Sequence, residues 1–205
     1  MRTPPKRLLL WFALAALALP TLAAGPARAA DPAIATIDGF DNGLLETMKD
    51  GKNLGVKGRY RKLSPVIERS FDLAAMTRFA VGPAWASFTP AQQQAVTEAF
   101  TKLSIASYAH NFADYDGQRF EIDPAVQTRG PDKIVQTHMI RPHDAPVALT
   151  YRMRESGGAW KIIDIYYGAI SQLTTRRSDF AAPIAAGGAS GLIAHLNGLI
   201  DGLMK

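Results

Sequence analysis

The chain has 205 residues, of which 23 are basic and 18 acidic, and it contains no cysteine. The lack of cysteine excludes disulfides, thiol catalysis and every metal site built from thiolates. A chain of this length suits one hydrophobic core, and it shows neither a dividing linker nor an internal repeat.

The N-terminus has the order of charge, apolar run and small residues that is typical of a secretory signal peptide. Basic residues at positions 2, 6 and 7 precede an uncharged run from Leu8 to Leu19, and Ala27-Arg28-Ala29 offers a cleavage site. The run is shorter than the roughly 20 residues that span a bilayer, which favours a cleaved peptide over a membrane anchor. We therefore expect residues 1–29 to be a signal peptide and residues 30–205 to be a single exported domain.

Cleavage changes the charge balance of the protein. Four basic residues and no acidic residue lie within 1–29, so the mature chain keeps 19 basic residues against 18 acidic ones. A chain this close to neutrality gives no indication of nucleic-acid binding. The four histidines, at positions 110, 138, 143 and 195, lack the spacing of metal ligands, so we expect no metal site.

The first half of the mature chain is predicted to be helical, since its apolar residues recur at three- and four-residue steps. A capping box at Thr89-Pro90-Ala91-Gln92 predicts the start of a long helix that ends near residue 112. Residues 49–62 are rich in glycine and basic side chains and lie between two expected helices. The other expected helices cover residues 34–48, 64–71 and 72–81.

The second half changes to the two-residue alternation of half-buried strands. Strands are expected over residues 119–122, 133–141, 146–154 and 160–170, followed by helices over 173–186 and 190–204 with Gly187-Gly188 between them. Segregated helices and strands predict an α+β fold, in which helices cover a curved antiparallel sheet of about four strands. Such a cone either fills with its own side chains or encloses a pocket.

Asp164 is the carboxylate of greatest interest, because it interrupts an otherwise apolar strand where a charge needs a partner. One interpretation is a general base in an apolar pocket with a tyrosine beside it. The other is a structural ion pair with an arginine. The candidate tyrosines are Tyr151, Tyr166 and Tyr167, and the candidate arginines are Arg78, Arg152 and Arg176.

Two long segments of the chain have a recognisable sequence. The first runs from Phe71 to Trp85 and continues at 88–92, and the second includes residues 160–165, 171–173 and 176–180. Together they resemble the MlaC family of periplasmic lipid-binding proteins, also called the toluene-tolerance auxiliary transport family. Segments 60–68, 106–109 and 171–178 look closer to one branch, the hopanoid-biosynthesis-associated HpnM proteins. The run 168–171 departs from the general family pattern, which leaves the choice of lipid open.

The resemblance implies a fold similar to nuclear transport factor 2, with an apolar cavity that holds acyl chains while the headgroup stays in solvent. It implies a periplasmic shuttle for phospholipid or hopanoid. The partners would be an inner-membrane ABC or RND-type lipid transporter and an outer-membrane lipoprotein complex. We expect a monomer with no cofactor other than lipid cargo, and no enzymatic activity.

The bulky apolar residues of the helices and the sheet are either ordinary core or the lining of this cavity. The lipid-binding candidates are Phe71, Met76, Phe79, Trp85, Phe88, Phe100, Leu103, Tyr108, Met139, Leu149, Tyr151, Ile163, Ile165 and Tyr167. In the basic stretch 49–62 the candidates for docking a partner or anionic lipid heads are Lys57, Arg59, Arg61 and Lys62, unless that stretch is a solvated loop. The alternatives are an isomerase or dehydratase with Asp164 as base, and a non-lipid binding module.

Overall fold

The structure is a computed structural model that describes residues 31–205, and the expected signal peptide lies outside these residues. The helices of the described part are α1 (Pro32–Lys49), α2 (Gly51–Ser70), α3 (Leu73–Val81), the short η1 (Gly82–Ser87), α4 (Pro90–Asn111) and α5 (Gln172–Leu203). Its strands are β1 (Arg119–Ile122), β2 (Gln127–Arg129), β3 (Asp132–Arg141), β4 (Asp144–Ser156), β5 (Ala159–Tyr167) and β6 (Ile170–Ser171).

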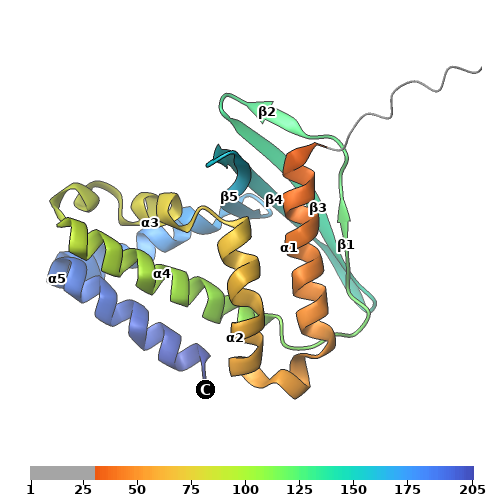
Figure 1. Cartoon of the computed structure of the whole chain (residues 1–205), viewed down its shortest axis with the longest axis horizontal. Helices are drawn as coiled ribbons and strands as arrows, with labels where there is room; N and C mark the ends of the chain where they lie inside the picture. Colours follow the sequence, from red (N-terminus) through yellow and green to blue (C-terminus); the bar gives the residue numbers. More distant parts are fainter. Residues whose placement is uncertain (1–30) are drawn as a thin grey trace, which may run out of the picture.

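The strands form one antiparallel sheet in the order β1-β3-β4-β5-β6, and β2 pairs with the other end of β3. Figure 1 shows the helices gathered on one side of this curved sheet, with α1 lying against it and α4 further away. Helix α5 starts directly after β6, at the edge of the sheet, and runs on to pack against α4. The α+β prediction is confirmed. The described part has six strands rather than about four, because β2 and β6 are too short to give an alternation signal.

Helix α1 begins where its local sequence directs it to begin. The Asp31 carboxylate accepts a hydrogen bond from the Ala33 N–H at 2.9 Å, and Pro32 occupies the first helical position. The apolar face of the helix, which includes Ile37, Phe40 and Leu44, is almost completely buried against the rest of the protein. This face supplies one wall of the core.

Helix α2 begins at Gly51, well before the expected helix start at Ser64, so most of the glycine-rich and basic stretch 49–62 is helical. A kink at Gly55, where φ is 60°, hides the helix from a periodicity argument. Tertiary contacts fix this segment: Arg59 Nε donates to the Ala109 carbonyl at 2.6 Å, and the Ala113 carbonyl lies where a Cβ of Gly51 would stand. A neighbouring segment, rather than local propensity, therefore decides the conformation.

The long helix α4 confirms the capping-box prediction. The Thr89 side chain accepts from the Gln92 N–H at 3.3 Å, and the Gln92 side chain accepts from the Thr89 N–H at 2.9 Å. Helix α5 also matches its sequence pattern, because the backbone leaves helical geometry at Gly187 and Gly188 and divides it into two segments. Gly188 has φ of 56°, a conformation that favours glycine.

A change of register in the β4–β5 pairing alters which side chains of β5 point toward the helices. Arg152 pairs with Asp164, whereas the next residue, Met153, pairs with Ile162, which leaves Ile163 without a partner in the ladder. A bulge of this kind shifts the alternation by one residue. As a result both Ile162 and Ile165 lie on the inner face, which simple alternation along β5 does not predict.

Candidate functional site

A cavity of about 700 Å³ lies between the inner face of the sheet and the helices. This volume is within the range of roughly 300–1,000 Å³ that is usual for small-molecule sites. Ten of the predicted lipid-binding residues line it: Phe71, Met76, Phe100, Leu103, Tyr108, Met139, Leu149, Tyr151, Ile165 and Tyr167. The apolar faces of helices and strands that are distant in sequence therefore line one cavity.

Four predicted residues do not line the cavity. Phe79 is exposed on α3, where the guanidinium of Arg177 lies 5.5 Å from the centre of its ring. Trp85 and Phe88 contact each other beside η1, with ring centroids 6.4 Å apart. Ile163 is the extra residue of the β5 bulge. These placements depend on the packing of α3 and η1 and on the register shift.

The sequence argument missed the contribution of the first two helices. The apolar residues of α1 carry a clear helical period, but only the tertiary arrangement distinguishes a core face from a cavity wall. The lining residues that α1 and α2 add are Phe40, Leu44, Met48 and Ile67. Other elements add Phe112, Phe120, Val147 and Leu173.

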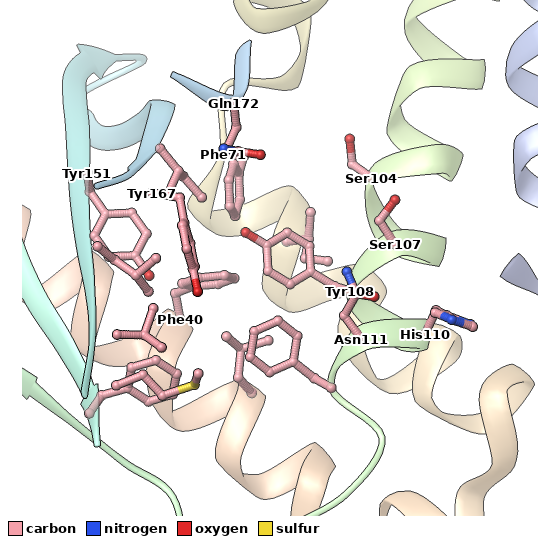
Figure 2. Close-up of a pocket in the computed structure, with 18 of the residues that line it drawn as sticks. Phe40, Phe71, Ser104, Ser107, Tyr108, His110, Asn111, Tyr151, Tyr167 and Gln172 are labelled. Atoms are coloured by element: carbon pink, nitrogen blue, oxygen red, sulfur yellow. The ribbon is translucent and has the colours of Figure 1, made fainter. Parts of the chain in front are cut away.

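Aromatic rings build the closed wall of the cavity around Phe40. The Phe40 ring meets Phe71 at 5.1 Å, Tyr108 at 5.4 Å and Tyr151 at 6.2 Å, each in an edge-on arrangement. Such edge-to-face pairs are favourable beyond their buried area. Figure 2 shows Tyr151 and Tyr167 extending from the sheet and Tyr108 facing them from α4. The wall is therefore almost wholly apolar and closely packed.

A carboxyl group, Asp41, is buried behind this wall. Its side chain is 3% exposed, and Oδ1 accepts a long hydrogen bond of 3.5 Å from the Tyr151 hydroxyl. Within residues 31–205 its Oδ2 has no hydrogen-bond partner. Burial raises the pKa of Asp41 to about 8, and the nearby charge of Asp38 acts in the same direction. Asp41 is therefore mostly a neutral acid at pH 7.

The mouth of the cavity is polar and exposed. On one side it is bordered by the final turns of α4, and on the other by Tyr167, Gln172 and the half-buried Arg176. Figure 2 shows the α4 side chains across the hollow from Tyr167 and Gln172. The lining residues on the α4 side are Ser104, Ser107, His110 and Asn111. An apolar interior with a polar rim suits a ligand that has an apolar body and a polar head.

Asp164 has a role that differs from both interpretations of the sequence. Its Oδ1 accepts from the backbone N–H groups of Ile165 at 2.8 Å and Leu173 at 3.1 Å, and its Oδ2 accepts from the Ser171 hydroxyl at 2.7 Å. These bonds hold the start of α5 against β5. No tyrosine or arginine bonds to this carboxylate in the described part of the chain. Asp164 belongs to the cavity lining, but both of its oxygens are engaged in these bonds, which favours a structural role over that of a general base.

The basic stretch of α2 divides into buried and exposed members. Arg59 is 8% exposed, and its guanidinium is held by the Ala109 and Gly51 carbonyls at 2.6 and 2.7 Å. Arg59 is therefore not available for docking in this conformation, contrary to the prediction. Lys57, Arg61 and Lys62 are exposed, so a cationic surface remains.

Two further observations limit the chemistry of residues 31–205. They contain no cluster of three or more His, Asp or Glu side chains that could hold a metal ion. Over the same residues, no helix combines the length and apolar character needed to cross a membrane.

The fold and the site together define a class: a small α+β protein built around an open apolar cavity, which suits binding rather than catalysis. Comparison with known families matches residues 39–198 to the MlaC protein family. The chain belongs to the MlaC family. It is also similar to the structure of a phospholipid-binding protein from Ralstonia solanacearum, solved in complex with a phospholipid. The identity is 27% and the TM-score 0.74, over 84% of this chain and 99% of that one.

Proposed function

We propose that this protein is a periplasmic shuttle that carries phospholipid or hopanoid between outer-membrane and inner-membrane transport components. The observation that carries the proposal is the open apolar cavity of about 700 Å³ with a polar mouth. Membership of the MlaC family and the phospholipid bound by the Ralstonia relative support a lipid as the ligand.

The cavity can hold acyl chains tightly. Each buried methylene group contributes about 0.8 kcal/mol, so a chain that reaches the wall around Phe40 is strongly retained. Met48, Met76 and Met139 add flexible side chains that adapt to chains of different length. The headgroup would remain at the mouth, near Gln172. Selection among lipids with similar chains, including the choice between phospholipid and hopanoid, then depends on the fit of the interior and on the rim.

Exchange with protein partners needs a surface on which those partners can dock. The exposed Lys57, Arg61 and Lys62 on α2 provide cationic charge for an acidic partner. We infer that this surface docks an inner-membrane ABC or RND-type transporter or an outer-membrane lipoprotein complex. Reversing Lys57 and Arg61 to Glu should weaken docking to these partners and leave lipid affinity unchanged. Unchanged docking would argue against the assignment of this surface.

The decisive test is to identify lipid in the native protein. The mature protein would be purified without denaturant, extracted with organic solvent, and the extract analysed by mass spectrometry. A stoichiometric phospholipid would support the general role of a phospholipid carrier, and a hopanoid would favour the HpnM branch. Folded protein with an empty cavity would contradict the proposal.

A matched pair of variants controls for lipid that adheres to the surface. Leu149 lines the cavity, so Leu149→Trp should fill part of it and reduce the bound lipid at least about tenfold. Leu199 is 37% exposed and does not line the cavity, so Leu199→Trp should retain the lipid of the wild type. Equal lipid in both variants would show that the lipid is not held in the cavity.

A further inference from the structure

The hairpin between β5 and β6 exposes two large apolar side chains beside the cavity mouth. Tyr167 is 56% exposed and Ile170 is 63% exposed, the two largest values among the large apolar side chains of residues 31–205. They are direct partners in the β5–β6 pairing, on either side of a short turn in which Gly168 has φ of 60°. Adjacent apolar side chains that a soluble protein leaves in water commonly mark an interaction surface.

Positive charge follows this hairpin closely along the chain. Arg176 and Arg177 follow in the first two turns of α5, which begins two residues after Ile170. The Arg176 guanidinium lies 3.9 Å from the Asp179 carboxylate, at the outer limit of an ion pair, and Arg177 is exposed beside Phe79. We use the name mouth patch for Tyr167, Ile170, Arg176 and Arg177.

The mouth patch is continuous with the interior of the cavity. Tyr167 and Arg176 belong both to the patch and to the cavity lining, so an apolar path leads from the exposed hairpin to the buried wall. An acyl chain that follows this path stays in contact with apolar side chains. The opposite rim is more polar, because its lining residues His110, Asn111 and Asp114 carry polar groups. The neighbouring Tyr115 is 41% exposed, less than Tyr167 or Ile170.

We propose that the mouth patch docks the cavity directly on the surface of an anionic lipid bilayer. The combination of exposed apolar side chains with arginines is typical of surfaces that bind anionic membranes. A tyrosine is well suited to the interface, since its ring is apolar and its hydroxyl is polar. This inference rests on the proposed lipid transport, and it adds that lipid enters or leaves where the mouth touches the bilayer.

Sedimentation with vesicles tests the inference. The mature protein would be mixed with vesicles of phosphatidylcholine alone, or with a third of the lipid replaced by phosphatidylglycerol. Wild-type protein should bind the anionic vesicles and lose binding as salt is raised. Ile170→Ser and Arg177→Gln should each weaken binding about fivefold, and the double variant about twentyfold. Neither residue lines the cavity, so both variants should keep their cargo.

Two control variants distinguish this surface from others. Leu199→Ser removes an exposed apolar side chain of α5 that does not line the cavity, and Arg61→Gln removes one charge from α2. Both should bind anionic vesicles as the wild type does. If Arg61→Gln weakens binding as much as Arg177→Gln, or if wild-type protein does not bind anionic vesicles, the mouth patch is not a membrane-docking surface.

The cargo measurement separates this failure from failure of the proposed function. Protein that carries stoichiometric lipid but does not bind vesicles would overturn the docking inference alone and point to transfer through protein partners. Folded protein that carries no lipid would overturn the proposed function, whatever its affinity for vesicles.

Discussion

At the closed wall of the cavity Phe40 is fully buried and Tyr151 is 1% exposed, whereas at the mouth Tyr167 and Ile170 expose more than half of their surface. The wall is held by edge-on aromatic contacts of Phe40 with three other rings, whereas the hairpin at the mouth is held to the sheet by a strand of only two residues. The difference suggests that one part of the cavity stabilises the fold and another part controls the movement of lipid. Changes at the wall should alter folding, and changes at the mouth should alter the movement of lipid.

The largest expected effect concerns Asp41, which sits behind the wall. Its pKa is raised to about 8 in the folded protein from 3.8, so between these values the folded state holds a proton that the unfolded state releases. The free energy of unfolding should therefore fall as the pH rises through this window, by up to about 1.4 kcal/mol per pH unit. Asp41→Asn, which stays neutral, should lack this dependence.

Denaturant unfolding of lipid-free protein between pH 5 and pH 8 measures the effect. The difference in unfolding free energy between wild type and Asp41→Asn isolates this group, because the other carboxylates are common to both proteins. Parallel pH curves for the two proteins would show that Asp41 is ionised in the fold at neutral pH.

Truncation of a side chain in the wall should have the next largest effect on the free energy of unfolding. Phe40→Ala removes the ring that Phe71, Tyr108 and Tyr151 all contact, and should lower the unfolding free energy by about 3–5 kcal/mol. Chemical denaturation of lipid-free protein measures this loss. A loss below about 1 kcal/mol would mean that the wall rearranges around the missing ring and is not rigid.

Removal of the Tyr151 hydroxyl, which links the wall to Asp41, should have a smaller effect on stability. Tyr151→Phe removes a hydrogen bond that lowers the pKa of Asp41, so this pKa should rise further. Loss of the bond should cost about 0.5–1.5 kcal/mol of stability at pH 6. Titration of the Asp41 carboxyl by NMR in both proteins measures the shift, and a lower pKa in Tyr151→Phe would contradict this account.

The smallest effect on stability is expected at the mouth. Tyr167→Ser should change the unfolding free energy by less than about 0.5 kcal/mol, since the side chain is mostly in water already. The same change should slow the uptake of a fluorescent phospholipid from anionic vesicles, because it removes part of the apolar path. If Tyr167→Ser destabilised the fold as strongly as Phe40→Ala, the contrast between wall and mouth would be lost.

Much of the fold could be predicted because its signals are local. The capping box at Thr89, the break at Gly187-Gly188 and the alternation along β4 are each decided by a few neighbouring residues, and the structure contains all three. The candidate site was predicted less completely. Ten lining residues were identified from their apolar character, whereas Phe40 was not distinguished from the core.

The sequence by itself determined where most helices and strands begin, because caps, breaks and alternation act over a few residues. Only the tertiary structure decided the conformation of α2, where Arg59 bonds to Ala109, fifty residues away. It also decided the environment of Asp41 and the exposure of Ile170. These depend on which segments pack together, since burial, pKa and accessibility are properties of neighbours in space.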